Sequence, residues 1–512
     1  MTTETKGTAT TTATVEEQTS LESLFSSINV EVTEAALSAV DYGYVTSEEN
    51  KEDVLKNDFA RVGAALSAIF ANTEADNIKT YNKELTRSVI DRIDEVIEKQ
   101  INDIIKDAKF REIEQQWLSI QDLYDSIPRD KNVEVSIFDA SKDELLDDFE
   151  TNAVDVSSSE FFKKVYVDEY DQYGGEPYGS IVGLYEFENT EDDINWLSVM
   201  GKISATSHSP FISAASPKFF GCENMSDLKE IKNLGAMMSH HRYGKWNTFR
   251  KTSQAAYIGL TLPRYLARSP YDPINNPAGK LLPSFEEKIG NPESSEDFAW
   301  GNASILMAKN MMRSFEKTGW CQSIRGVHSG GTVENLASYS YNTRGMEETK
   351  IPVEFMIPDY RELDFANAGF MPFVYKKESN EGCFFSANSI KLKEEFQDPK
   401  DSENSQLIAN ISYTMSISRI AHYVKVMVRD KIGGNDDEMT LSAFLNKWIF
   451  QYVTTVPDPS PLTASYHPFK AASISVNKVE GMSGWYNSSI SILPHIQFEG
   501  MDVELTVDAR LG

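Results

Sequence analysis

Cysteine is scarce in this sequence, and long apolar runs are absent from it. Its three cysteines, Cys222, Cys321 and Cys383, lie far apart and include no C-x-x-C pair. An odd number of scattered cysteines cannot form a closed disulfide framework, which is typical of a reducing compartment. No run reaches the roughly 18 apolar residues of a membrane span, and the first residues lack the basic and apolar regions of a secretory signal. We therefore expect a cytoplasmic protein without membrane insertion.

Positive charge is also scarce. The chain carries 49 Lys and Arg residues against 78 Asp and Glu residues, which gives a net charge of −29. Such a charge repels nucleic acid and anionic membranes, so we expect neither as a principal partner, and basic protein surfaces are better candidates. A composition of 40% hydrophobic and 25% charged residues is ordinary for a globular protein.

Motifs of enzymatic chemistry are missing as well. The glycine cluster in "IRGVHSGGTVENL" is not followed by Lys and Ser or Thr, so it is not a Walker phosphate loop. The adjacent His240 and His241 would point in different directions on a helix or a strand, which makes them poor joint metal ligands. Neither an H-E-x-x-H nor a G-x-S-x-G motif occurs. We expect no catalytic residue, metal or cofactor, although a carboxylate pair brought together by the fold remains open.

The first quarter of the chain reads as helical. Residues 1–50 are rich in Thr and Ala and are expected to form a flexible arm. From residue 51 to Pro128 the apolar residues recur at helical spacing and predict at least two long amphipathic helices. The last apolar face before Pro128 comprises Phe110, Ile113, Trp117, Ile120 and Tyr124.

Residues 129–400 show the alternating pattern of an α/β core. A first strand is predicted from three alternating apolar residues, Val133, Val135 and Ile137. The stretch "GSIVGLYEF" predicts a buried strand, Thr190 and Asp193 mark the start of a helix, and "SPFISAAS" predicts the next strand. Strand, helix and strand in succession indicate a crossover unit. The proline-rich segment Ser269–Pro292 is expected to be a long surface loop.

Residues 401–512 are predicted to hold helices followed by strands. A helix running from about Asn404 continues through "SRIAHYVKVMVRDKIGG", where a basic ridge faces away from the apolar arc. The ridge comprises Arg419, His422, Lys425 and Arg429. It needs an acidic neighbour, and two alternatives stay open. The neighbour is either an acidic surface on another protein or this chain's own acidic excess.

The last forty residues alternate between apolar and polar and predict β-strands with glycine at the turns. Their apolar positions are candidate interface residues: Ile474, Val476, Ile490, Ile492, Val503, Leu505 and Val507. Unpaired terminal strands can add to the sheet of another chain. A local meander is the alternative.

Seven stretches, in order along the chain, carry a resemblance. They are "YGGEPYGSIVGLYEF", "HSPFISAASPKFFG", "FRKTSQAAYIGLTLPRYLARSPY", "FAWGNASILMAK", "GWCQSIRGVHSGG", "IPVEFMIPDYRELDFANAGFMPF" and "SRIAHYVKVMVRDKIGG". Together they resemble the large sheath subunit of bacterial type VI secretion systems, the TssC/VipB/IglB family. The resemblance runs from about Glu114 to the C-terminus.

The resemblance implies a non-enzymatic protein with an α/β, phage-tail-sheath-like core that is completed by a small partner subunit. In that family a small sheath subunit (TssB/VipA/IglA-like) forms a heterodimer with the large one. The heterodimers stack on a baseplate as a helical tube around an inner tube of Hcp-like rings. Contraction propels the inner tube and effectors out of the cell, and an AAA+ ATPase later dismantles the sheath.

The same resemblance implies roles for two parts of this chain. Residues 51–128 would pack with the small subunit, and the C-terminal strands would interlace neighbouring protomers. Two other classes of function stay open from the residues alone. They are a cytosolic scaffold that never polymerises and an acidic α/β hydrolase with an unrecognised carboxylate site.

Overall fold

The computed structural model describes residues 83–495, apart from 130–132, 280–281, 283, 293, 435–436, 457–458 and 481–485. The chain divides into two units, Met1–Asp107 with Tyr271–Lys288 and Ala108–Pro270 with Ile289–Gly512. The arm predicted over residues 1–50 and the first of the N-terminal helices lie outside the described residues. So do the candidate interface residues Val503, Leu505 and Val507.

In the first unit, a long helix binds a loop. Helix α5 (Lys83–Lys106) corresponds to the second predicted N-terminal helix. The amide of its buried Asn102 bonds the loop twice: Nδ2 donates to the carbonyl of Glu286 at 3.3 Å, and Oδ1 accepts from the N–H of Lys288 at 2.7 Å. The described residues of the proline-rich segment Ser269–Pro292 form no helix and no extended strand, so the predicted loop is confirmed.

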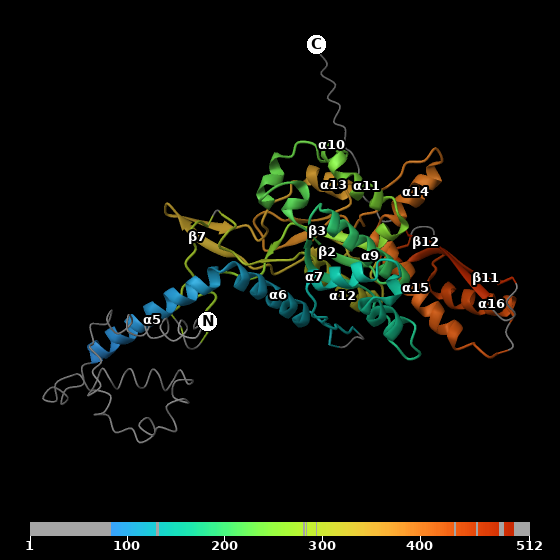
Figure 1. Ribbon diagram of the computed structural model, residues 1–512, viewed down its shortest axis with the longest axis horizontal. Helices are drawn as coiled ribbons and strands as arrows, with labels where there is room; N and C mark the ends of the chain where they lie inside the picture. The colour runs from blue at the N-terminus through green and yellow to red at the C-terminus, as the bar shows by residue number, and fades with distance from the viewer. Residues whose placement is uncertain are drawn as a thin grey trace, which may run out of the picture. The chain divides into compact units, whose positions relative to one another are not determined.

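A six-stranded sheet forms the centre of the second unit (Figure 1). Its order is β1 (Ile181–Phe187), β2 (Phe211–Ala215), β3 (Ile258–Leu262), β9 (Met371–Tyr375), β10 (Gly382–Phe384) and β6 (Thr332–Val333). The strands from β1 to β9 pair in parallel, and β10 is antiparallel to both of its neighbours. The predicted crossover unit is confirmed, because α9 (Glu191–Ser207) connects the parallel β1 and β2.

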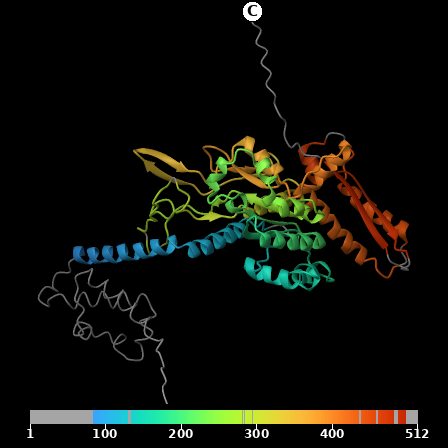
Figure 2. The same cartoon turned by 45° about the horizontal axis from the view of Figure 1, so that its top comes forward.

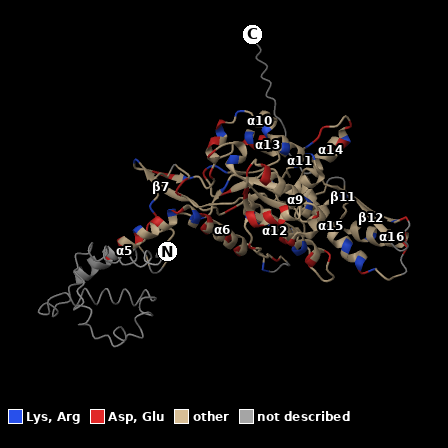
Figure 3. Cartoon of the chain, viewed as in Figure 1, with Lys and Arg blue, Asp and Glu red and all other residues tan. Residues whose placement is uncertain are grey.

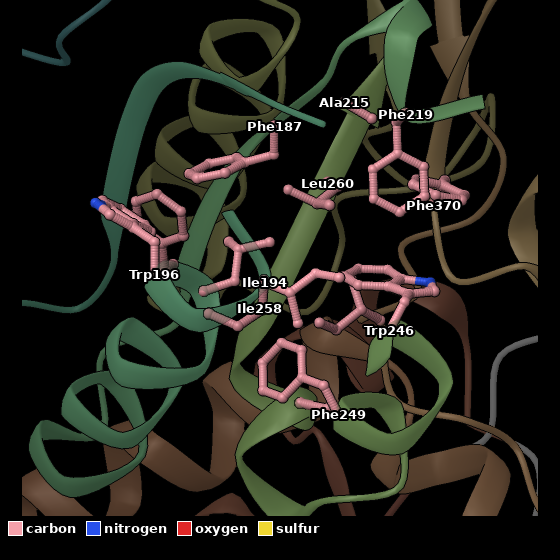
Figure 4. Close-up of a cluster of buried hydrophobic side chains, with 14 of the residues drawn as sticks. Phe187, Ile194, Trp196, Ala215, Phe219, Trp246, Phe249, Ile258, Leu260 and Phe370 are labelled. Carbon is pink, nitrogen blue, oxygen red and sulfur yellow. The ribbon is translucent and has the colours of Figure 1, made fainter. Parts of the chain in front are cut away.

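Helices cover both faces of this sheet. On one face, α9 and α11 (Gly244–Arg250) contribute aromatic side chains to a buried cluster (Figure 4). Trp196 of α9 packs there against Phe211 of β2, with the ring centroids 5.4 Å apart. The next residue, Ile212, lies in the cluster on the opposite face with residues of α12 (Ser304–Thr318) and α15 (Ile411–Arg429). This is the alternation that a doubly covered strand requires.

The C-terminal part forms a smaller cluster of its own. Strands β11 (Phe469–Lys478) and β12 (Tyr486–Pro494) pair as an antiparallel hairpin that packs on α16 (Glu438–Ile449), as Figure 2 shows. Leu445 of α16 and Ile474 of β11 are both fully enclosed. The strands predicted from the alternating pattern are therefore confirmed up to Pro494.

The remaining elements are short or peripheral. The α-helices are α6 (Ala108–Asp125), α7 (Lys142–Thr151), α8 (Glu160–Phe162), α10 (Leu234–Met238), α13 (Asp359–Asn367), α14 (Pro399–Ile408) and α17 (Pro461–Tyr466), and η4 (Lys163–Tyr170) is a π-helix. The 3₁₀ helices are η3 (Val156–Ser158), η5 (Pro217–Phe220), η6 (Met225–Glu230), η7 (His241–Tyr243), η8 (Ser253–Tyr257) and η9 (Phe450–Tyr452). Strands β4 (Tyr265–Leu266) and β5 (Trp300–Gly301) pair, as do β7 (Tyr339–Thr343) and β8 (Met346–Lys350). In the described part of the chain, no helix combines the length and apolar character that crossing a membrane would need.

Two local predictions are wrong. The described residues of 133–137 are assigned to no strand, because alternation supplies an apolar side but not a neighbouring strand to bond. The helix predicted from about Asn404 is two helices. It breaks at Asn410, whose side-chain oxygen accepts from the N–H of Ser412 and so starts α15 afresh.

Candidate assembly interfaces

Helix α15 carries the ridge predicted from the sequence, that is Arg419, His422, Lys425 and Arg429. Its other side is buried in the core, where Ile420 and Val424 are enclosed. The amphipathic helix is therefore confirmed. The next question is which groups the four ridge residues contact.

Two ridge residues meet an acidic neighbour in the same chain. Lys425 Nζ lies 2.8 Å from Asp171 Oδ1, directly after the π-helix η4. Arg429 Nη1 donates to the carbonyl of Gln172 at 2.8 Å, and its Nη2 donates to the carbonyl of Asp171 at 3.1 Å. Lys425 Nζ also lies 3.7 Å from the ring centroid of Tyr170, within cation–π range. The intrachain alternative thus has its carboxylate, while a contact of these residues with another subunit stays a prediction.

His422 is half-buried beside the same π-helix. Its Nε2 lies 2.9 Å from the carbonyl oxygen of Ser207, so the ring donates there, and its centroid lies 5.2 Å from that of Tyr170. Burial lowers the pKa of His422 to about 4, although the hydrogen bond to Ser207 acts in the opposite direction. Burial likewise lowers the pKa of the neighbouring His208. A lowered pKa favours the neutral form of both rings, which suits packing against Tyr170.

Arg419 is held by aromatic rings instead of a carboxylate. Its guanidinium carbon lies 4.6 Å from the ring centroid of Phe315, 5.5 Å from that of Trp320 and 5.1 Å from that of Tyr423. Its Nη2 donates to the hydroxyl of Tyr423 at 2.8 Å. Among the described residues no ion pair is formed by Arg419. A contact of Arg419 with an acidic group of another subunit stays a prediction.

The candidate interface residues of the hairpin pack inward. Ile474 and Val476 of β11 are buried, and Ile490 and Ile492 of β12 are partly buried in the cluster that α16 forms with Leu445. The side chains of these residues therefore hold the hairpin onto its own helices. Any pairing with another chain has to use the backbone of a strand edge.

The outer edge of β11 is closed by side chains of α16. Ser442 Oγ and Asn446 Nδ2 both donate to the carbonyl of Ile474. Glu438 Oε1 accepts from the N–H of Lys478 at 3.0 Å. The backbone N–H and carbonyl of Ile474 point away from β12, so Ile474 and its partner Ile490 form a pair without hydrogen bonds to each other. The N–H and carbonyl of Ile490 therefore point to the outer edge of β12. In the described part of the chain, no side chain bonds that edge of β12.

Helix α6 is anchored to the core by one of its sides. Arg268 Nε lies 2.7 Å from Glu114 Oε1, and Lys309 Nζ lies 2.7 Å from Asp122 Oδ1. Leu123 packs in a cluster with residues of α12. These contacts fix which side of α6 faces the core.

The other side of α6 is apolar and exposed. The side chains of Ile113, Trp117 and Tyr124 are 56%, 64% and 71% exposed, and Ile137 in the following extended segment is 64% exposed. A contiguous face of large apolar residues is a feature of protein interfaces. The sequence predicted this face as part of a helix, but not as an interface. The signal that could have found it is the spacing of Ile113, Trp117 and Tyr124 at i, i+4 and i+11, which places three large apolar side chains on one side of the helix.

Carboxylates with shifted pKa values lie in structural networks. Burial raises the pKa of Glu186, and Arg264 partly offsets that shift from 3.7 Å while binding Glu354 with both ends of its guanidinium. Burial also raises the pKa of Glu362, which accepts from Ser386 at 2.6 Å. Within the described residues, no group of His, Cys, Asp and Glu is arranged to hold a metal ion.

Comparison with known families matches nearly all of the described chain. Residues 87–391 match the family described as EvpB/VC_A0108, tail sheath N-terminal domain. Residues 400–511 match EvpB/VC_A0108, tail sheath gpW/gp25-like domain. The type VI secretion system sheath protein TssC1 of Pseudomonas aeruginosa is 38% identical over 429 residues, which cover 83% of this chain and 85% of that protein.

Two solved structures are distantly similar. One is the six-fold symmetrised baseplate of the anti-feeding prophage, with a TM-score of 0.36 and 9% identity over 74% of this chain and 84% of the other. The second is the contracted helical sheath of the same prophage, with a TM-score of 0.28 and 9% identity over 61% and 67% of the two chains.

Proposed function

The chain belongs to the EvpB/VC_A0108 tail sheath family, and on this basis we propose that it is the large subunit of a two-component type VI secretion sheath. It is a structural subunit of a contractile sheath, since its identity with TssC1 extends over most of both chains. It forms a heterodimer with a small sheath subunit in the cytoplasm. The heterodimers polymerise around an inner tube of Hcp-like rings and contract to propel that tube and its effectors out of the cell.

The observation that supports the proposed heterodimer is the exposed apolar side of α6. Trp117 and Ile113 would leave a large apolar area in water unless a partner covers it. The ion pairs of Glu114 and Asp122 keep this side turned outward, so the chain itself presents it. We assign it to the small sheath subunit, which the family places against the N-terminal helices.

Co-purification with the small subunit tests this assignment. Ile113→Ser and Trp117→Ser together should lower the recovery of the heterodimer by about tenfold or more, because exposed aromatic anchors dominate binding energies. Met439→Ser, at a residue 80% exposed on α16, is the matched control and should leave the heterodimer intact. Unchanged co-purification of the double variant would refute the role of α6.

The outer edge of β12 is the place we assign to strand exchange between protomers. The backbone groups of Ser488, Ile490 and Ile492 point away from β11, because they alternate with the groups that hydrogen-bond β11. The opposite edge of the hairpin is covered by α16. An added strand would extend the two-stranded sheet by main-chain hydrogen bonds. Strands predicted around Val503 and Leu505 in a neighbouring copy have the alternation for this role.

The remaining partners follow from family membership. Neighbouring protomers and the baseplate complete the sheath, and an AAA+ ATPase dismantles it after contraction, in direct contact with this chain or through the small subunit. The energy of contraction lies in the many repeated interfaces of the lattice. Purified heterodimer should therefore hydrolyse no ATP, and measurable turnover would contradict this.

Electron microscopy of the co-expressed subunits tests the function as a whole. Hollow tubes are expected. Discrete particles at every salt concentration would instead favour the scaffold that never polymerises.

A further inference from the structure

A long stretch of this acidic chain contains no carboxylate at all. No Asp or Glu occurs between Glu230 and Asp272, although the chain has 78 such residues among 512. In the second unit this stretch forms α10, η7, α11, η8, β3 and β4. Figure 3 shows Lys and Arg positions around α10 and α11.

The basic residues of this stretch fall into two groups. Four of them have partners that hold the fold together: Arg250 with the carbonyls of Ile390 and Asn367, Arg264 with Glu354, Arg268 with Glu114, and Lys245 with Glu191. The others are exposed, and within the described residues no ion pair is formed by Lys232, Arg242 or Lys251. With the exposed His240 and His241, these residues make up what we call the basic surface.

The basic surface is tied to the fold at both ends of α11. Arg242 Nη2 donates to the carbonyl of Phe220 at 2.9 Å, which fixes that side chain over η5. At the other end, Lys391 Nζ donates to the carbonyl of Lys251 at 2.8 Å and so brings a further cation beside it. These hydrogen bonds hold Arg242 in place at one end of α11 and Lys391 beside Lys251 at the other.

Helix α7 presents the opposite charge. Asp143, Asp147 and Glu150 are spaced at i, i+4 and i+7, so they lie on one side of the helix, and all three are exposed. No ion pair involves them in the described part of the chain. We call these three residues the acidic face. Lys142, the basic residue of α7, forms an ion pair with Asp193 of α9 at 2.7 Å, so its charge does not neutralise the acidic face.

We propose that the basic surface of one copy of this chain docks against the acidic face of α7 in a second copy. The proposal rests on the proposed function, because polymerisation makes copies neighbours. Chains with a net charge of −29 repel one another, so a lattice of them needs a contact where opposite charges meet. Such complementary surfaces fix register and suppress wrong pairings more than they add raw affinity.

Charge reversal and its rescue test the contact. One variant, Lys232→Glu with Lys251→Glu, reverses the basic surface. The other, Asp147→Lys with Glu150→Lys, reverses the acidic face and spares Asp143, whose carboxylate suits the first turn of the helix. Each variant, co-expressed with the small subunit, should form at least about tenfold fewer sedimentable tubes, because like charges then meet. All four substitutions in one chain should restore assembly.

Matched variants and the heterodimer itself serve as controls. Lys377→Glu with Lys400→Glu, and Asp401→Lys with Glu403→Lys, change the same charges at exposed positions elsewhere and should assemble normally. Every variant should still co-purify with the small subunit, which separates this contact from the α6 interface. Normal assembly of either reversed variant, or no rescue in the fourfold variant, would overturn the proposal. Loss of tubes with the basic reversal alone would also overturn it and point to the inner tube as the occupant.

Sedimentation keeps the two proposals distinguishable. If the unaltered pair forms no tubes, the proposed function fails, but the contact is still measurable. At low salt the two reversed heterodimers should associate when mixed and not when alone, since each supplies the charge that the other has lost. Equal sedimentation of the mixture and the separate variants would refute the contact independently of tube formation.

Discussion

Asn446 of α16 holds Ile474 of β11 by both of its backbone groups. Its Nδ2 donates to the Ile474 carbonyl at 2.6 Å, and its Oδ1 accepts from the Ile474 N–H at 2.9 Å. A side-chain amide here takes the place that a neighbouring strand would take in a wider sheet. The hairpin is therefore open to a further strand on the β12 side only, within the described residues.

Replacing Asn446 with Ala should destabilise this hairpin. The N–H of Ile474 would lose its partner in a partly buried place, and we expect a loss of about 1–3 kcal/mol in the free energy of unfolding. Thermal unfolding of the heterodimer measures it. Asn487→Ala, at an exposed residue of β12, is the control and should change stability little. Equal stability of both variants would show that Asn446 is dispensable.

The ion pair between Lys425 and Asp171 predicts a loss of stability on charge reversal that a second substitution restores. Lys425→Glu places two carboxylates together and should cost roughly 1 kcal/mol, the upper range for a partly exposed pair. Asp171→Lys in the same chain should restore most of the loss. A double-mutant cycle of unfolding midpoints measures the coupling. A stable Lys425→Glu heterodimer that forms no tubes, with no rescue by Asp171→Lys, would instead place the partner of Lys425 in another subunit.

Periodicity predicted the elements of this fold better than it predicted their neighbours. The helical face of α6, the crossover at α9 and the ridge of α15 all follow from local spacing. Asp171 could not be assigned to Lys425 in this way, because the two residues are 254 positions apart. The alternation of Val133 and Ile137 predicted a strand that the structure does not form, because pairing depends on a partner strand that the pattern does not contain.

The candidate sites show the same limit. Ile474 and Val476 were selected because they alternate, and that alternation proved to describe the side chains that pack on α16. The edge of β12 is defined by backbone hydrogen bonds, which have no signal in the sequence. The hairpin of β7 and β8 was not predicted, since most of its residues are polar and exposed.

Truncation should separate folding from polymerisation, provided that it is made after residue 495. All described residues then remain, including Ile474 and Ile490 in the hairpin cluster. The heterodimer should form with an unchanged unfolding midpoint, while tubes should be lost because the strand predicted around Leu505 is missing. Ending the chain at Ser473 is a less specific experiment, because it also removes the hairpin side chains that pack on Leu445. Tubes formed by the chain that ends at residue 495 would refute the role of the last strand.

The half-buried His422 predicts how stability depends on pH. Burial lowers the pKa of its imidazole to about 4 in the folded chain, against a usual value near 6.5. Between these values the unfolded chain binds a proton that the folded chain does not, so stability falls as pH is lowered from about 6.5 towards 4. Above about 6.5 both states are neutral at this residue, and it contributes no pH dependence. The full loss is on the order of 3 kcal/mol.

Comparison with His422→Gln isolates this contribution from that of the carboxylates. The glutamine amide can still donate to the carbonyl of Ser207, but it does not titrate. Below pH 6.5 the unfolding midpoint of the variant should therefore fall less steeply than that of the unaltered heterodimer, and the two curves should run parallel above it. Parallel curves across the whole range would mean that the ring of His422 takes up its proton without unfolding. Since burial, with smaller contributions from Arg419 and Lys425, is what lowers the pKa of that ring, such a result would mean that neither the burial nor these charges keep the proton off His422 in the folded chain.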